Sequence, residues 1–307
     1  MEFLKVLVTG ATGFVGKILV RQLVQGGHEV VILTRNVANA ALNLGSKNCK
    51  YFLWSDTNQA PPVEAFDNIE GVINLLGENI ADKKWDDAQK RKIHDSRVNG
   101  TAQLVKTIST LTHKPKVFVS TSAVGIYGNR EDEDVTESSK EGTDFLATVC
   151  KDWEDAAMKV QAFIPRVVII RVGVVLGRGG GALKKMLPIF KLGGGGPLGT
   201  GRQYMSWIHV EDLAAMYVEA LRNENIQGPY NGTAPYPATN KEFTKALGRA
   251  LKRPTFAPAP AFVMKLVFGE MSQMLLEGQK VLPLKFKDQK FRYRYPTLEM
   301  ALKESAH

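Results

Sequence analysis

Cysteine is scarce in this chain of 307 residues, which contains only Cys49 and Cys150. Two cysteines in different sequence settings exclude a disulfide framework and a cysteine-rich metal site, so we predict no metal centre. Long apolar runs are missing too, because none approaches the roughly 18 residues that a membrane-spanning helix needs. We therefore expect no membrane partner, and a location in the cytoplasm, or in an organellar stroma or matrix where a transit peptide has been removed.

The basic residues of the chain are not concentrated in one segment. The net charge is +9, and the densest basic stretch spans residues 280–294, whereas other basic residues are spread along predicted helices. Within that stretch Phe291, Tyr293 and Tyr295 alternate with arginines, which predicts a C-terminal strand with one buried and one solvated face. Because nucleic-acid binding needs basic residues gathered on one surface, we expect no nucleic-acid partner.

Short apolar or β-branched runs alternate with helical patterns over the first 175 residues. The runs predict strands at 4–8, 29–33, 50–53, 71–75, 116–120 and 166–172. Helices are predicted at 15–25 and 146–160, with one or two more within 82–111. Strands that alternate with helices form a parallel sheet. The predicted fold class is therefore α/β, a Rossmann-type doubly wound parallel sheet with a smaller C-terminal lobe.

Three glycines at three-residue intervals stand between the first predicted strand and the first helix. Gly10 allows a tight turn, Gly13 lets the backbone approach a pyrophosphate, and Gly16 allows the helix to pack closely on the strand. Free N–H groups and the positive dipole at the helix N-terminus favour the same anion. The alternative is a turn without a ligand. The predicted cofactor-binding residues here are Thr9, Gly10, Thr12, Gly13, Phe14, Val15 and Gly16.

The second predicted strand is followed by Thr34, Arg35 and Asn36, with no acidic residue among them. An Asp or Glu at this place binds the ribose 2′-hydroxyl of NAD, whereas a basic residue binds the 2′-phosphate of NADP. We therefore predict NADP(H) as the cofactor, with Arg35 pairing with the 2′-phosphate. The alternative is an arginine that merely lies at the surface.

The composition changes after residue 175, where glycine-rich and then proline-rich segments begin. We predict an NADP(H)-binding Rossmann domain over residues 1–175, with a returning segment near 205–235 that contains a helix at 210–221. Residues 176–204 and 236–307 are predicted to form the smaller substrate-binding or C-terminal lobe.

Further motifs stand at the ends of the predicted strands and helices. They are TGATGFVG at 9–16, NLLG at 74–77, VNGT at 98–101, FVSTSA at 118–123 with IYG at 126–128, and WIHVEDLA at 207–214. Together they resemble the extended, epimerase-like branch of the short-chain dehydrogenase/reductase superfamily. The segments LGENI at 76–80, GVVLGRGGG at 173–181 and LEGQKV at 276–281 narrow the resemblance to its atypical NAD(P)-dependent epimerase-family proteins, which carry a small C-terminal domain of unassigned role. The resemblance covers essentially the whole chain and implies cofactor contacts at Leu75, Gly77 and Glu78.

The catalytic pair of that superfamily is missing. There, a Tyr four residues before a Lys transfers the proton, because the ammonium and the nicotinamide lower the pKa of the phenol. None of the eight tyrosines here has a lysine four positions later, and the corresponding helix carries Leu146 and Cys150 instead. Cys150 lies on the apolar face of that helix, so we expect a buried thiol without a nucleophilic role.

Three residues are candidates for the acid–base chemistry. Glu78 follows the strand at 71–75, at the mouth where ligands gather, and the alternative for it is a solvated loop carboxylate. Ser122 follows the strand at 116–120 and could hydrogen-bond a substrate oxygen, and Tyr127 could donate a proton. The alternatives are a strand-end hydroxyl that satisfies the backbone and an aromatic ring that only packs. Arg171 lies in an apolar strand, so we expect it to meet a substrate or a buried carboxylate.

Two functions remain open. The first is an NADP(H)-dependent oxidoreductase or epimerase-like enzyme that acts on a carbonyl or sugar-nucleotide-like small molecule. The second is a catalytically silent dinucleotide-binding sensor or scaffold protein. The complete glycine motif and the remaining polar candidates favour the enzyme. The apolar face of the helix at 146–160 is either a homodimer contact or a core face.

Overall fold

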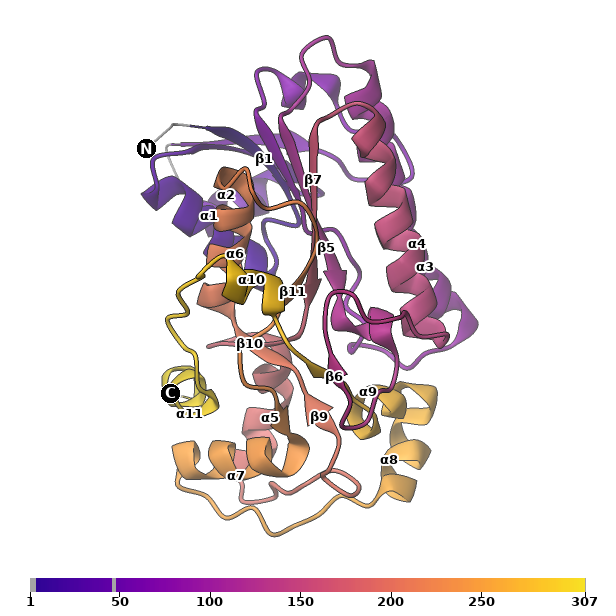
Figure 1. Cartoon of the computed structure of the whole chain (residues 1–307), viewed down its shortest axis with the longest axis vertical. Helices are drawn as coiled ribbons and strands as arrows, with labels where there is room; N and C mark the ends of the chain where they lie inside the picture. The colour runs from indigo at the N-terminus through magenta and orange to yellow at the C-terminus, as the bar shows by residue number, and fades with distance from the viewer. Residues whose placement is uncertain (1–3, 46–47, 307) are drawn as a thin grey trace.

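The computed structural model describes residues 4–45 and 48–306. Its main element is a seven-stranded parallel sheet with the order β11-β7-β5-β4-β1-β2-β3 (Figure 1). The strands are β1 (Lys5–Thr9), β2 (Glu29–Thr34), β3 (Cys49–Leu53), β4 (Gly71–Asn74), β5 (Val117–Ala123), β7 (Arg166–Val172) and β11 (Gly228–Gly232). The predicted Rossmann-type fold class is confirmed, and six of these strands lie where the sequence predicted them.

Helices cover both faces of the sheet (Figure 1). One face carries α1 (Phe14–Gln25), α2 (Val37–Leu44) and α6 (Val210–Arg222), and the other carries α3 (Asp87–Thr110) and α4 (Phe145–Met158). The side chains of β5 alternate between the two layers, since Val119 packs on the α1 and α6 side and Phe118 on the α3 and α4 side. The segment 82–111, for which one or two helices were predicted, contains the single long helix α3.

The apolar face of α4 is covered within the chain itself. Its buried residues Val149, Cys150, Trp153 and Ala157 face the sheet and α3. The predicted face is thus a core face, which leaves it unavailable to a second copy of the chain.

The smaller lobe contains short helices and strands (Figure 1). Many of them pack around a separate apolar core. Its helices are α5 (Gly181–Lys191), α7 (Asn240–Leu251), α8 (Ala261–Phe268), α9 (Gln273–Leu276) and α11 (Leu298–Ser305), with α10 (Leu284–Asp288) lying beside β11. Short strands join in pairs: β8 (Val174–Leu176) with β10 (Trp207–His209), β9 (Tyr204–Met205) with β12 (Ala238–Thr239), and β6 (Asp134–Val135) with β13 (Lys280–Val281). Trp207, Phe243 and Leu302 are buried in this core. Among the described residues, no helix is long and apolar enough to span a membrane.

The predicted C-terminal strand is wrong. Within 280–294 only Lys280–Val281 forms a strand; residues 291–293 have no regular secondary structure and residues 294–295 lie in a bend. The alternation itself is real, because Phe291 and Tyr293 pack on the core beside α6. The buried carboxylate of Asp212 takes the place of a neighbouring strand, since it accepts hydrogen bonds from the N–H groups of Arg294 (2.7 Å) and Tyr295 (2.9 Å).

Candidate functional site

The glycine turn after β1 is as tight as its spacing predicts. Gly10 has a φ of +64°, and a Cβ atom there would lie 2.5 Å from the carbonyl oxygen of Leu75. A Cβ atom at Gly16 would overlap the carbonyl oxygen of Gly10. Side chains at either position would therefore separate β1 from β4 or from α1. Leu75, a predicted cofactor contact, forms the wall beside this turn.

The N-terminus of α1 is open. Gly13 is its N-cap residue, no side chain caps the helix, and its first turn contains no acidic residue. The first N–H groups of a helix have no partner within the helix, so those of Phe14, Val15 and Gly16 face outward with the positive end of the helix dipole. Thr12 is partly buried in the turn that leads to them. This arrangement fits a pyrophosphate.

Thr9 has a structural contact where the sequence suggested a cofactor contact. Its fully buried hydroxyl donates to Asn74 Oδ1 (2.8 Å) and accepts from the N–H of Leu75 (3.1 Å). Asn74 in turn donates to the hydroxyls of Thr101 (2.9 Å) and Ser120 (3.3 Å). This buried network ties the ends of β1, β4 and β5 together beneath the glycine turn.

Arg35 follows the end of β2, as predicted. Its side chain is exposed and makes no hydrogen bond or ion pair with any residue that the structure describes. The neighbouring Asn36 caps α2 by accepting a hydrogen bond from the N–H of Asn39 (2.9 Å). The guanidinium is thus free to bind a phosphate at this end of the glycine turn.

A second glycine-rich loop covers the ring of Phe14. A Cβ atom at Gly177 would lie 2.8 Å from Phe14 Cζ, and one at Gly180 would overlap the ring. Gly180 is also the N-cap residue of α5, which likewise has no side-chain cap. The loop carries Arg178, whose exposed side chain has no partner within 4–45 and 48–306. The structure places this loop beside α1.

The end of β4 brings Gly77 and Glu78 against α3. The N–H of Glu78 donates to Ser96 Oγ (3.0 Å), and Arg97 donates to the carbonyl of Glu78 (3.0 Å) and to that of Ile93 (2.9 Å). A Cβ atom at Gly77 would lie 3.1 Å from Arg97 Cζ. The predicted contacts Gly77 and Glu78 therefore lie at the C-terminal edge of the sheet, next to Arg97. No sequence motif indicated Arg97 as a site residue.

Ser122 lies at the end of β5, on the side of α4. It is buried, and its Oγ has no oxygen or nitrogen partner among the described residues. The thiol of Cys150 lies beside it, and burial raises the pKa of Cys150 to about 12. The expected burial of the thiol is confirmed, and the Ser122 hydroxyl has this thiol as its neighbour and hydrogen-bond partner.

Tyr127 lies in a buried polar cluster. Its hydroxyl donates to Asn231 Oδ1 (2.7 Å) and accepts from Arg171 (2.9 Å). Arg171 also binds both carboxylate oxygens of Glu154 (2.9 and 2.8 Å), which is the buried carboxylate expected for it. Burial raises the pKa of Tyr127. Its proton is therefore held inside the protein, which argues against Tyr127 as a donor to substrate.

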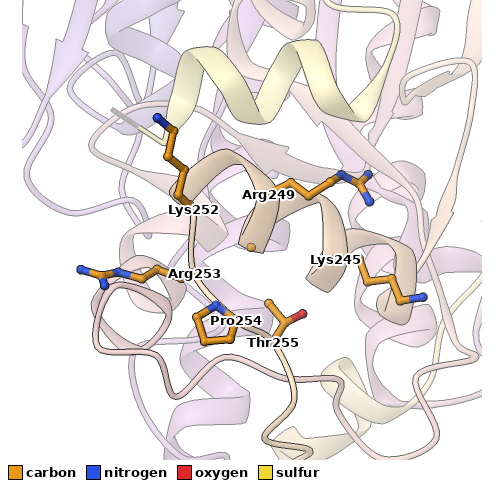
Figure 2. A pocket seen from close by; sticks show the side chains of 7 residues that line it. Lys245, Arg249, Lys252, Arg253, Pro254 and Thr255 are labelled. Atoms are coloured by element: carbon orange, nitrogen blue, oxygen red, sulfur yellow. The ribbon is translucent and has the colours of Figure 1, made fainter.

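A basic hollow of about 340 Å³ lies apart from the glycine turn, at the C-terminal end of α7. It is lined by Lys245, Gly248, Arg249, Lys252, Arg253, Pro254 and Thr255 (Figure 2). Figure 2 shows that Lys252 and Arg253 point away from Lys245 and Arg249, and Arg249 pairs with Glu299 (3.1 Å). These basic side chains therefore point in different directions and do not converge on one anion.

A model of the NAD dependent epimerase/dehydratase family matches residues 6–231. The chain belongs to this family. A second model, for a domain of unknown function named DUF1731, matches residues 259–305. The resemblance to epimerase-family proteins with a small C-terminal domain of unassigned role is therefore confirmed.

Relatives of this family member span its whole length. The "Epimerase family protein SDR39U1 homolog, chloroplastic" of Arabidopsis thaliana is 40% identical over 300 residues, which are 97% of this chain and 85% of that protein. The epimerase family protein YfhF of Bacillus subtilis is 39% identical over 302 residues, which are 98% of this chain and 97% of that protein.

Solved structures agree with the fold. A crystal structure of human epimerase family protein SDR39U1 with NADPH has a TM-score of 0.87 at 37% identity, and the match covers 98% of this chain and 99% of that one. A UDP-glucuronic acid 4-epimerase from Bacillus cereus has a TM-score of 0.80 at 16% identity, with 98% of each chain covered, and shares the fold.

In this epimerase-family protein, Leu146 and Cys150, the two positions that the resemblance aligns with the catalytic pair, have apolar surroundings. Leu146 packs in a cluster with Phe145, Val149 and Met271, which joins α4 to the C-terminal region matched as DUF1731. Four positions later the thiol of Cys150 is buried. Neither side chain can transfer a proton or carry a positive charge at neutral pH.

Proposed function

We propose that this protein is an NADP(H)-dependent oxidoreductase or epimerase-like enzyme that acts on a carbonyl or sugar-nucleotide-like small molecule. The observation that carries the proposal is the combination of an open α1 N-terminus with an unpaired arginine, Arg35, at the end of β2. Uncapped helix N–H groups attract the pyrophosphate, and a guanidinium attracts the 2′-phosphate that distinguishes NADP from NAD. The crystallisation of human SDR39U1 with NADPH supports the same cofactor.

Different residues at the C-terminal edge of the sheet bind different parts of the cofactor in this proposal. Gly10, Gly13 and Gly16 let the backbone approach the pyrophosphate, and Arg35 holds the adenosine end. When bound, NADP(H) donates or accepts a hydride. The chain must then orient the substrate oxygen and manage its proton.

Ser122 is the residue that we assign to the substrate oxygen. Its buried hydroxyl has no oxygen or nitrogen partner among the described residues and lies beside the weakly hydrogen-bonding Cys150 thiol, so a substrate oxygen that reached it would be the stronger partner. Because Tyr127 already donates to Asn231, we assign the proton to water.

Cofactor binding gives the direct test. We expect the purified protein to bind NADPH more tightly than NADH, and Arg35→Ala to weaken NADPH binding by about tenfold to a hundredfold without affecting NADH. Arg202→Ala, at an exposed arginine of the smaller lobe, is the matched control and should change neither affinity. Failure of the unaltered protein to bind any dinucleotide would refute the proposal.

Turnover separates the enzyme from the alternative function. For an enzyme, NADPH oxidation should require a carbonyl compound, and Ser122→Ala should lower kcat about 10²- to 10⁴-fold while NADPH affinity stays unchanged. A dinucleotide-binding sensor or scaffold would bind NADPH and show no turnover across a broad carbonyl panel. The apolar Leu146 and buried Cys150 are the observation that favours this second function.

A further inference from the structure

Arg97 on α3 holds a positive charge that pairs directly with no carboxylate of the described residues, although the Glu78 carboxylate is near enough to interact with it. Its side chain is partly buried, and it forms no ion pair within the described residues. Its hydrogen bonds go to the uncharged carbonyl groups of Ile93 and Glu78, and its guanidinium lies 5.2 Å from the ring of Trp153. Burial lowers the pKa of Arg97, and the nearby Glu78 carboxylate opposes this shift without cancelling it.

Two other arginines with little exposure, Arg171 and Arg166, have partners that compensate their positive charge. Arg171 pairs with both carboxylate oxygens of Glu154. Arg166 donates to carbonyl groups that include those of Ala220 and Leu221 at the C-terminus of α6, the negative end of that helix dipole. Arg97 has neither kind of compensation, because Ile93 lies inside α3. An enclosed charge left in this state is costly unless a further partner arrives.

The position of Arg97 indicates which partner. Its guanidinium lies against Gly77 at the end of β4, and Cys150, which lies near Arg97, adjoins Ser122 at the end of β5. In the sheet order, β4 and β5 lie on the opposite side of β1 from β2 and Arg35. A dinucleotide whose pyrophosphate lies at β1 and whose adenosine lies at β2 places its nicotinamide half over β4 and β5.

We propose that Arg97 binds the nicotinamide-side half of NADP(H), donating hydrogen bonds to its ribose or phosphate oxygens. This inference rests on the proposed cofactor. Arg97 would thus supply from α3 the positive charge that Cys150 cannot supply from α4. Its free N–H groups are suited to hydroxyl and phosphate oxygens, and they remain available after the bonds to Ile93 and Glu78 are made.

Truncated ligands test the inference. NADPH and adenosine 2′,5′-bisphosphate, which lacks the nicotinamide half, are titrated into the unaltered protein and into Arg97→Gln, which keeps N–H donors but removes the charge. We expect Arg97→Gln to weaken NADPH binding about tenfold to a hundredfold and to leave the bisphosphate affinity unchanged. Arg97→Lys should recover part of the loss, and Arg91→Gln, at an exposed arginine of the same helix, should bind both ligands normally.

The outcomes distinguish the two proposals. Equal weakening of both ligands by Arg97→Gln, or no weakening of either, would overturn the role of Arg97 while leaving NADP(H) binding in place. Binding of neither ligand by the unaltered protein would overturn both proposals. A crystal structure of the unaltered protein with NADPH needs no variant to fold: an Arg97 nitrogen within about 3.2 Å of a ligand oxygen supports the inference, and its absence overturns it.

Discussion

Phe14, the first residue of α1, lies so close to Gly180, the N-cap residue of α5, that a Cβ atom at position 180 would overlap its ring. The contact joins the two uncapped helix N-termini of the candidate site. It also couples the glycine-rich loop of the smaller lobe to the turn that approaches the pyrophosphate. Movement of the ring would therefore disturb both.

Gly180→Ala tests this contact. The backbone at Gly180 has a φ of −155°, which any residue adopts, so only the overlap with Phe14 opposes the new methyl group. We expect the free energy of unfolding to fall by about 1 to 3 kcal/mol and NADPH binding to weaken. Chemical denaturation and an NADPH titration measure the two effects. Gly194→Ala is the control, because its Cβ atom would meet its nearest neighbour, Ile189, at an ordinary 3.5 Å.

The thiol of Cys150 should be inert in the folded protein. Burial raises its pKa to about 12, so almost none of it is thiolate at pH 8, and alkylating reagents attack the thiolate. We expect iodoacetamide to leave Cys150 unmodified until urea unfolds the chain, when the pKa returns to about 8.5. Peptide mass spectrometry measures the modification. Rapid alkylation of Cys150 under native conditions would contradict its burial.

Much of the sheet could be predicted because its strands are local features. The strands β1 to β5 and β7 are apolar or β-branched runs bounded by turns, and burial between two helix layers requires that composition. The strand β11 has the sequence GPYNG, in which glycine, proline and asparagine oppose a strand. It forms because it pairs with β7, a contact that no local pattern contains.

The candidate site also contains some residues that the local sequence could identify and others that it could not. Gly10, Gly16 and Arg35 could be identified because their roles depend on spacing along one βαβ unit. Arg97 and Arg178 come from a distant helix and a distant loop, so tertiary packing alone brings them to the site. The C-terminal strand was wrong for a related reason: the alternation of residues 291–295 showed burial correctly, but the carboxylate of Asp212 replaced the partner strand.

His94 should make stability depend on pH above about 6.5, the ordinary pKa of histidine. Burial alone would lower its pKa, but hydrogen bonds to Asp95 (3.0 Å) and Asp152 (3.1 Å) raise the pKa above the ordinary value of 6.5. A raised pKa in the folded state stabilises the protein below pH 6.5, and this contribution is lost as the pH rises through the folded-state value. The melting temperature of His94→Gln should therefore fall below that of the unaltered protein at pH 6 and approach it at pH 8.5. His113→Gln, at an exposed histidine, should show no such pH dependence.

The ion pair between Arg171 and Glu154 should be costly to break from one side. Both side chains are nearly buried, with 7% and 11% of their surface exposed, and the guanidinium also donates to the hydroxyl of Tyr127. Arg171→Met leaves the Glu154 carboxylate enclosed without its partner, so we expect a loss of about 3 to 5 kcal/mol in the free energy of unfolding. Arg249→Met breaks an exposed pair with Glu299, in which both side chains are 64% exposed, and should cost less than about 1 kcal/mol. Urea denaturation compares the two variants, and equal losses would show that enclosure does not determine the strength of the Arg171 pair.

Adding Glu154→Leu to Arg171→Met removes the stranded carboxylate, so the double variant should be more stable than Arg171→Met alone, because the larger part of the loss comes from the unpaired charge.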